Sequence, residues 1–385
     1  MKVALVLSSG FKRLAPHVGA LRAYFEAEKA GKVPHPHFII GASAGAIAST
    51  ACLPWSDKNF EKITDAIINL KKSNIYSMWH LTELCGALTL GESFLNFIPV
   101  LNHDFLRSRR GQILIESGRT GISLFAKLGF FYELLKQPSI FSSEPLSHLL
   151  KKQLDFEAIW NSDIKLEIPS VDLKTAEMFY FTNYLPEHRQ CPNRDQAVID
   201  AVRGSASVAA FLQPISIGNH LLDDAAILNN IPLDRAMNAG CEIIFVIMHM
   251  PYLEKVNLKN EKITWVEELN RAIDIAIGRN TELTLQWHHG INHDLEVIQV
   301  IDRILKQMFD NPNKTTEQFN QIQVLKTAIG KLSSYGRTKT KIIPVFCDEQ
   351  LPSMTFNQFN PPHLRRGIEL GYRAMKKTLE KVSFS

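Results

Sequence analysis

The chain has 385 residues, of which 45% are hydrophobic and 21% charged, with 20 glycines and 18 prolines, so it is neither mainly disordered nor a low-complexity or fibrous protein. The formal net charge of +4 arises from 43 basic and 39 acidic residues, and this small excess gives no indication of nucleic acid as a partner. The length is enough for one large α/β domain or two ordinary domains.

Cysteine usage and the N-terminus indicate where the protein works. The five cysteines lie far apart and never form a C-x-x-C pair, so they predict neither a disulfide framework nor a zinc site and fit a reducing compartment. The apolar run at residues 3–7 is too short for the hydrophobic region of a signal peptide and reads as a buried strand. We therefore expect a cytoplasmic or peripheral membrane protein without a Sec signal peptide.

Two apolar stretches, residues 84–101 and 121–135, raise the question of a membrane span. Gly86, Gly91 and Pro99 interrupt the first stretch, which is shorter than the roughly 20 clean apolar residues of a spanning helix. We expect no transmembrane helix. Buried core or cap is the favoured interpretation of the first stretch, an apolar flap over a lipid site is its alternative, and the second stretch leaves the same choice open.

The first fifty residues predict a strand, a loop, a helix, a second strand, a tight turn and another helix. Residues 3–8 form the first strand, Pro16 suits the first turn of the helix, and residues 38–40 form the second strand. A strand–helix–strand opening predicts a parallel sheet with helices on both faces. We therefore expect an α/β fold in three layers, α/β/α, with a mostly parallel central sheet.

The rest of the chain divides into a helical segment, a group of strands and a second helical segment. Residues 56–160 are mostly helical, and we expect them to form a cap over the functional site. Further strands are expected at residues 166–168 with 171–173, 178–181, 243–248 and 342–346, and long helices at 263–285 and 295–332. We expect a core over residues 1–250, including the cap, and a mainly helical region over 251–385 that packs on it and contributes one late strand.

The last predicted helix is amphipathic. Its apolar positions recur every three or four residues and form one stripe: Leu364, Ile368, Tyr372, Met375, Leu379 and Val382. Arginines and lysines occupy the other faces. Such a helix can lie on a membrane, but we favour an outer helix whose basic faces meet solvent.

The sharpest local motif is G-A-S-A-G at residues 41–45, a G-x-S-x-G between a predicted strand and a predicted helix. A serine nucleophile needs this context, because small neighbours allow the tight turn that pushes the hydroxyl above the sheet. Any cluster of small residues can also end a strand. Ser43 is therefore a candidate nucleophile that needs a base and an oxyanion hole.

A histidine held by a carboxylate is one possible base. In α/β-hydrolases the catalytic order is Ser, then Asp or Glu, then His, and His363 would be the least unsuitable partner. Ser43 follows only two predicted strands, which leaves no room for the strands that precede such a nucleophile. A Ser-His-Asp esterase is therefore disfavoured.

A second set of motifs covers more of the chain. They occur in this order: V-D-L-K-T at 171–175, R-G-S-A-S at 203–207, Q-P-I at 213–215, and L-D-D-A-A-I-L-N-N-I-P-L at 222–233. With Ser43, this pattern resembles the patatin-like phospholipases over about residues 3–250. The resemblance implies a serine lipid acyl hydrolase, of phospholipase A or lysophospholipase type, that cleaves carboxylic esters of membrane lipids through a Ser43–Asp224 dyad. It implies a phospholipid or related lipid ester as substrate, peripheral membrane contact, and neither metal nor cofactor.

The resemblance assigns the base to Asp224. An exposed aspartate with a pKa of about 3.9 is a poor base for a hydroxyl, but burial raises the pKa and a direct hydrogen bond makes the transfer effectively intramolecular. Asp223 is the lesser candidate. Without the other motifs, an Asp-Asp pair would indicate only a turn.

The loop after the first strand departs from the family. Where the family has G-G-G-x-R-G, residues 9–14 read S-G-F-K-R-L, and the aligned oxyanion-hole residues are Gly10, Phe11, Lys12 and Arg13. Backbone N–H groups stabilise an oxyanion, so loss of glycines need not abolish the hole, although it restricts the loop. An active hydrolase with a reshaped pocket is favoured. The alternative is a catalytically impaired protein that binds lipid or a partner.

A histidine-rich segment contains His288, His289, His293 and Asp294. These residue types can bind metal, but their spacing fits no H-E-x-x-H or similar zinc pattern. We interpret the segment as a polar surface helix.

Overall fold

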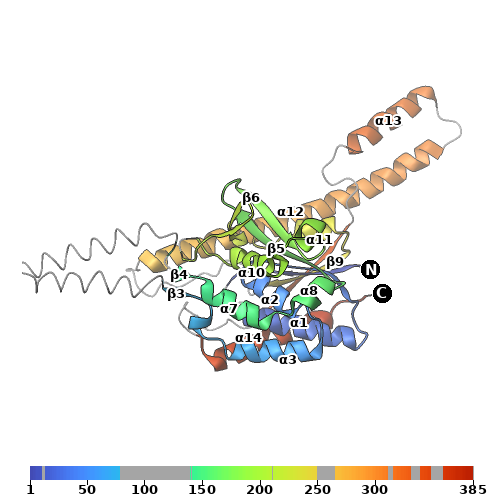
Figure 1. The fold of residues 1–385 in the computed structure, drawn as a ribbon. Coiled ribbons are helices and arrows are strands. Elements are labelled where there is room, and N and C mark those ends of the chain that lie inside the picture. Colours follow the sequence, from blue (N-terminus) through green and yellow to red (C-terminus); the bar gives the residue numbers. More distant parts are fainter. Residues whose placement is uncertain are drawn as a thin grey trace, which may run out of the picture.

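The computed structural model describes residues 1–10, 14–78, 139, 141–209, 211–248, 265–310, 315–330, 339–347 and 359–384. These residues form a central sheet with helices on both faces (Figure 1). Residues 84–101 and 121–135, most of the expected cap, and Phe11, Lys12 and Arg13 lie outside the described residues.

Within the described residues, eight strands form the central sheet, and five of them run parallel. The parallel strands follow the order β10 (Lys341–Phe346), β9 (Ile243–Met248), β1 (Val3–Leu7), β2 (Pro36–Gly41) and β5 (Lys165–Asp172). The antiparallel strands lie beyond β2, where β8 (His220–Asp224) and β6 (Glu177–Thr182) pair with β5, and β7 (Ile215–Ile217) pairs with β8. β1 and β9 are apolar and buried along their whole length, as expected for parallel strands covered on both faces.

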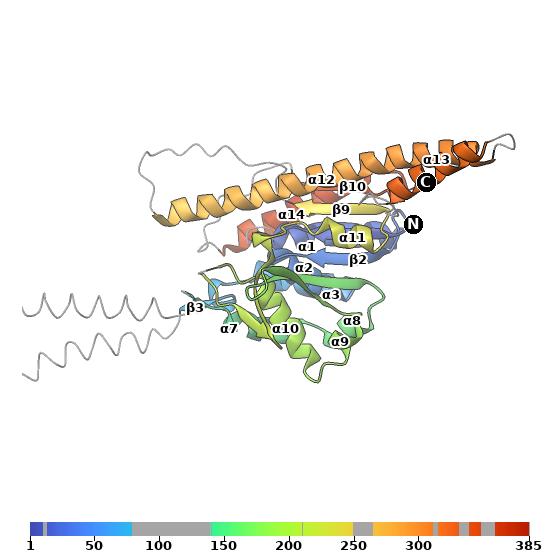
Figure 2. The same ribbon diagram turned by 90° about the horizontal axis from the view of Figure 1, so that it is seen from above.

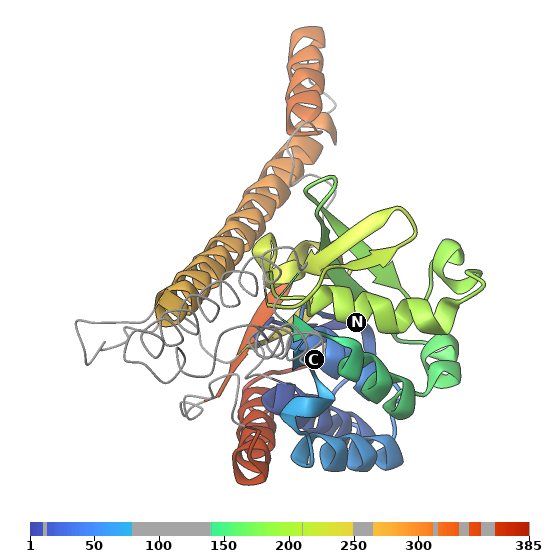
Figure 3. The ribbon, with the colours of Figure 1, turned by 60° about the vertical axis from the view of Figure 1, so that its left-hand side comes forward.

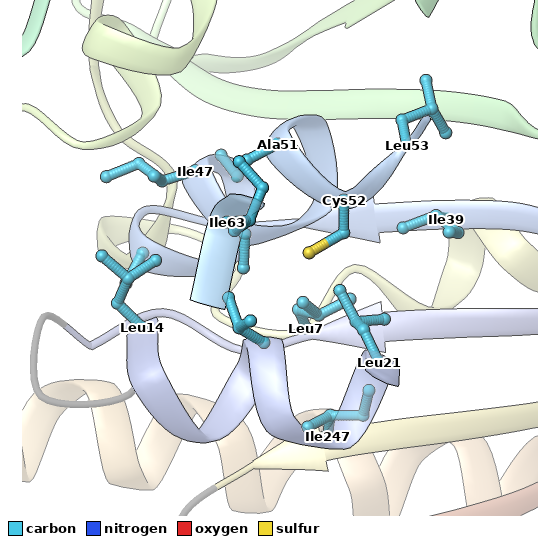
Figure 4. Close-up of a cluster of buried hydrophobic side chains, with 14 of the residues drawn as sticks. Leu7, Leu14, Leu21, Ile39, Ile47, Ala51, Cys52, Leu53, Ile63 and Ile247 are labelled. Carbon is cyan, nitrogen blue, oxygen red and sulfur yellow. The ribbon is translucent and has the colours of Figure 1, made fainter. Parts of the chain in front are cut away.

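Helices on one face of the sheet enclose the larger hydrophobic core. α1 (Leu14–Lys29), α2 (Ala44–Cys52) and α14 (Pro361–Leu379) pack on β1, β2, β9 and β10. Figure 4 shows part of this core, with Leu7, Leu21 and Ile39 between the strands and the helices. α3 (Asp57–Ile68), α7 (Glu144–Gln153), α8 (Phe156–Asn161) and α10 (Arg194–Ser205) extend the same core.

Two of the helices that the structure describes cover the opposite face. α11 (Leu233–Asn238) and the long α12 (Trp265–Asp310) pack on the other sides of the central strands, with Ile291 and Leu295 of α12 buried against them. Figure 2 shows α12 lying along this layer, and Figure 3 shows it running past the core to α13 (Thr316–Gly330). The three-layer α/β/α fold predicted from the sequence is confirmed.

Short elements complete the described chain: the 3₁₀ turns η2 (Lys72–Asn74) and η3 (Ala225–Ile227), the paired strands β3 (Ser77–Met78) and β4 (Phe141–Ser142), and α9 (Pro186–Arg189). Within the described residues, no helix is both long and apolar enough to span a membrane.

The final helix packs unusually closely on α1. A Cβ atom built on Gly19 would lie 1.9 Å from the Ile368 carbonyl oxygen, and one built on Gly371 would lie 1.9 Å from the Pro16 carbonyl oxygen. The two backbones therefore touch where both residues are glycine. Leu364, Ile368 and Met375 of the predicted apolar stripe are buried, while most of the basic side chains of α14 are exposed, as expected from the sequence.

The structure contains one hairpin that was not predicted, and it buries one histidine of a segment that was expected to be a polar surface helix. The β7–β8 hairpin was not predicted, although its two-residue loop contains Gly218 at φ 55° and Asn219, a recognised hairpin signal. The histidine-rich segment is not uniformly a polar surface helix. It lies inside α12, and His288 is only 1% exposed because this part of α12 packs on the sheet.

Candidate active site

Ser43 occupies a strained turn between β2 and α2. Its backbone has φ 55° and ψ −117°, and it is one of two non-glycine residues with positive φ in the described chain. Such a conformation is costly for a residue with a side chain and is typical of a nucleophile elbow. The Ser43 side chain makes no capping hydrogen bond to the backbone N–H groups of α2.

The two glycines of the motif are needed because backbones meet at this turn. A Cβ atom on Gly41 would lie 2.2 Å from the Gly45 carbonyl oxygen, and one on Gly45 would lie 2.7 Å from the Leu7 carbonyl oxygen. Real Cβ atoms do not approach other atoms so closely, so either glycine can be replaced only if the turn shifts. The sequence motif thus encodes the close contact between the turn and β1.

Asp224 ends β8, and its buried carboxyl lies next to the Ser43 side chain, whose hydroxyl lowers the pKa of the carboxyl. The carboxylate also accepts a hydrogen bond from the Ala226 N–H at 2.8 Å, which fixes its orientation. Burial raises the pKa of Asp224 from 3.8 to about 7, although the bonds from Ala226 and Ser43 act in the opposite direction. The structure therefore brings the candidate nucleophile and the candidate base together, with the carboxylate poised to exchange a proton near neutral pH.

Asp223, the lesser candidate for the base, has a different role in this geometry. Its Oδ1 accepts a hydrogen bond from the Asp224 backbone N–H at 2.9 Å. Burial raises its pKa to about 6. Successive residues of a strand point to opposite faces, so Asp223 supports the backbone of Asp224 while Asp224 meets Ser43.

The end of α10 holds the backbone of both candidate catalytic residues. The Ser205 hydroxyl accepts a hydrogen bond from the Ser43 N–H at 3.0 Å, and the Ser207 carbonyl accepts one from the Asp224 N–H at 3.1 Å. Both serines are fully buried. The sequence had indicated R-G-S-A-S only as part of the family pattern, and nothing in it indicated this bridging role.

The start of the expected oxyanion loop is described. Gly10 follows β1 with φ 120°, a conformation that side-chain-bearing residues rarely adopt. Ser9, the residue before it, is 1% exposed, and its N–H donates a hydrogen bond to Asn230 Oδ1 at 2.8 Å.

In the first turn of α2, the Gly45 N–H donates to the Ala42 carbonyl at 2.8 Å, and the Ala46 and Ile47 N–H groups donate to the Ser43 carbonyl at 2.9 and 3.2 Å. The Ala44 N–H, on the residue after Ser43, is not used in these bonds. The backbone N–H groups of Gly10 and Ala44 are thus the candidate oxyanion donors.

The other expected or conceivable sites lie elsewhere. The carboxyl next to the Ser43 side chain is that of Asp224, whereas His363 lies in the first turn of α14. A groove of about 420 Å³ is lined by Glu28, Leu53 and Trp55, beyond the far end of α2 from Ser43. Among the described residues, no group of three or more His, Cys, Asp or Glu side chains is placed to hold a metal ion.

Comparison with models of known protein families shows to which family this chain belongs. The model of the family described as patatin-like phospholipase matches residues 5–237, more than half of the sequence. The chain belongs to the patatin-like phospholipase family. The matched region of this patatin-like protein includes Ser43, Asp224 and the R-G-S-A-S motif, and it ends before α12.

Two solved structures are similar to this patatin-like protein at low identity. VipD from Legionella pneumophila is 13% identical with a TM-score of 0.38, and the match covers 99% of this chain and 67% of VipD. A chain of the SpcU–ExoU complex from Pseudomonas aeruginosa is 14% identical with a TM-score of 0.25, over 86% of this chain and 69% of that one. Both TM-scores are low, so the assignment rests on the family model. A comparison with curated protein sequences gives no match.

Proposed function

We propose that this protein is a serine lipid acyl hydrolase of phospholipase A or lysophospholipase type, with Ser43 as nucleophile and Asp224 as base. The observation that carries the proposal is a serine in a strained strand-to-helix turn next to a buried carboxylate whose pKa is raised to about 7. Membership of the patatin-like phospholipase family supports a lipid ester as the substrate.

The first half of the proposed reaction forms an acyl-enzyme. Ionised Asp224 takes the hydroxyl proton of Ser43 as Oγ attacks the ester carbonyl, and a tetrahedral intermediate forms with negative charge on the former carbonyl oxygen. The intermediate collapses, the bond to the leaving alcohol breaks, and Asp224 returns its proton to that alcohol. The products of this half are a lysolipid or glycerol derivative and an acyl group esterified to Ser43.

The second half releases the fatty acid. Asp224 takes a proton from a water molecule as the water oxygen adds to the acyl carbonyl. The second tetrahedral intermediate then expels the Ser43 alkoxide, which recovers the proton from Asp224. A free fatty acid leaves, and both side chains return to their starting states.

The surrounding backbone would supply the electrostatic stabilisation. The N–H groups of Gly10 and Ala44 are the proposed oxyanion donors, and the N-terminus of α2 adds the positive end of a helix dipole. Removal of a single oxyanion donor typically slows an acyl transfer by about 10²–10³-fold. Because these donors are backbone groups, the side chains of the loop after β1 can differ from the family pattern without removing them.

Fatty-acid release from phosphatidylcholine vesicles and from lysophosphatidylcholine micelles tests this function. We expect wild-type protein to release fatty acid, and Ser43→Ala and Asp224→Asn to reduce release to background. Asp223→Asn is the matched control, because asparagine keeps the acceptor oxygen for the Asp224 N–H, and it should stay within several-fold of wild type. Folded wild-type protein that binds these vesicles without hydrolysing any ester would favour the catalytically impaired lipid-binding alternative.

A further inference from the structure

α12 contacts the loop that follows the candidate base, although α12 lies beyond residue 237, where the family match ends. The Asn280 side chain donates a hydrogen bond to the Leu228 carbonyl at 2.7 Å. One residue further along the helix, the Thr281 hydroxyl accepts a hydrogen bond from Asn230 Nδ2 at 2.5 Å. The long helix therefore holds the segment between Asp224 and α11 by side chains on two successive residues.

Asn230 connects α12 to the strand that leads into the oxyanion loop. Its Oδ1 accepts hydrogen bonds from both the N–H and the hydroxyl of Ser9, with the N–H at 2.8 Å. Ser9 and Asn230 are each 1% exposed, and Thr281 is 7% exposed. We call Ser9, Asn230 and Thr281 the Asn230 bridge. It runs from the end of β1 through the loop after Asp224 to α12.

The donors and acceptors of the Asn230 bridge permit one orientation of the amide. The Ser9 N–H can only donate, so Oδ1 of Asn230 must face β1 and Nδ2 must face α12. The Thr281 hydroxyl donates its own hydrogen to the Ile277 carbonyl at 2.8 Å, which leaves a lone pair for Nδ2. Removing the Thr281 hydroxyl would leave a buried amide donor without its acceptor, and the amide would be free to rotate away from Ser9.

We propose that Thr281 is a positioning residue that acts through Asn230 to fix Ser9 and Gly10 relative to Asp224, so that α12 forms part of the working active site. This proposal rests on the proposed hydrolase function. Its physical reason is that the donors of an oxyanion hole must be preorganised, and a displacement of about 1 Å can cost about 10²-fold in rate. The covalent connection between Ser9 and the Gly10 N–H makes the oxyanion donor sensitive to the bridge.

Substitutions at Thr281 distinguish a role in positioning the oxyanion loop from an effect on stability alone. Thr281→Val removes the hydroxyl with almost no change of shape, and we expect kcat to fall about tenfold or more while KM changes less than about twofold. Thr281→Ser restores the hydroxyl and should return kcat to within about twofold of wild type. Thr284→Val is the matched control, because the Thr284 hydroxyl donates to the Asn280 carbonyl within the same helix, and it should leave both constants unchanged.

A second measurement does not depend on turnover. Amide hydrogen exchange of the peptide that contains Ser9 should be faster in Thr281→Val than in wild type and unchanged in Thr284→Val. If Thr281→Val does not fold, Asn280→Ala tests the neighbouring contact at a less buried position and should lower kcat in the same way.

The outcomes distinguish the two proposals. Wild-type protein without Ser43-dependent turnover would refute the hydrolase function, and the positioning role with it. Active wild-type protein whose kcat and Ser9 exchange are both unaffected by Thr281→Val would overturn the positioning role alone. A loss of kcat that Thr281→Ser does not rescue would also overturn it, because the loss would then not depend on the hydroxyl.

Discussion

Replacing Asp224 by asparagine should make the folded protein more stable at alkaline pH while it removes the base. Asparagine keeps an acceptor oxygen for the Ala226 N–H, which lies 2.8 Å from the carboxylate, and it carries no charge. In wild type, the same buried position must hold a carboxylate that ionises with a pKa of about 7. The cost of burying that charge is therefore present in wild type above neutral pH and absent in the variant.

The magnitude follows from the two pKa values of Asp224. Its pKa is about 7 in the folded protein against 3.8 for the ordinary side chain. Each tenfold change in proton affinity is worth about 1.4 kcal/mol, so ionisation of Asp224 lowers the free energy of unfolding of wild type by about 4 kcal/mol in full. Between about pH 4 and pH 7 the folded state binds the proton more tightly than the unfolded chain. Wild type thus loses stability as pH rises through this window, whereas Asp224→Asn does not.

Urea unfolding, followed by tryptophan fluorescence at pH 4 and pH 8, measures the effect. We expect Asp224→Asn and wild type to have similar free energies of unfolding at pH 4, and the variant to be more stable by a few kcal/mol at pH 8. Asp163→Asn, at a side chain that is 82% exposed, controls for the loss of one negative charge. A variant that is less stable than wild type at pH 8, or a difference that does not change with pH, would refute the reasoning.

Three further outcomes are expected. The kcat/KM for ester hydrolysis should rise with pH and level off above about 7, because Asp224 accepts a proton only when ionised; a pH profile that is flat from 5 to 9 would contradict this. Ser205→Ala should lower kcat and cost about 1–3 kcal/mol of stability, because the buried N–H of Ser43 loses its acceptor. Ser49→Ala, which removes a hydroxyl that bonds within its own helix, should leave kcat unchanged in the same assays. Gly371→Ala should destabilise the protein in urea unfolding, because the new Cβ meets the backbone of α1. Gly290→Ala, with open space around it in α12, should instead stabilise the protein by about 0.5–1 kcal/mol. Equal effects of the two substitutions would show that contact between the helices is not the cause.

Local features of the fold could be predicted from the sequence because their causes are local. The apolar strands, the G-x-S-x-G turn and the stripe of α14 each depend on residues within one element, so their patterns can be read directly. The β7–β8 hairpin carried its signal in Gly218-Asn219, but its short strands are only partly apolar. Asp224 became a candidate only through the joint family pattern, since an Asp-Asp pair alone indicates a turn.

The polar contacts that organise the site could not be predicted, because they join residues far apart in the chain. Ser43 and Ser205 are separated by 162 positions, and Ser9 and Asn230 by 221. Single polar residues such as Thr281 leave no periodic signal, and a threonine in a long helix ordinarily faces solvent or bonds to its own backbone. Only the packing of α12 on the sheet places Thr281 against Asn230.

Mass spectrometry after reaction with a fluorophosphonate tests the central claim most directly, because this reagent forms a covalent bond only with an activated serine. We expect one adduct on wild-type protein, located on Ser43, with none on Ser43→Ala and little on Asp224→Asn. Asp223→Asn should label like wild type. A folded wild-type protein that takes up no reagent, or an adduct that persists in full on Asp224→Asn, would contradict the account in which Asp224 activates Ser43.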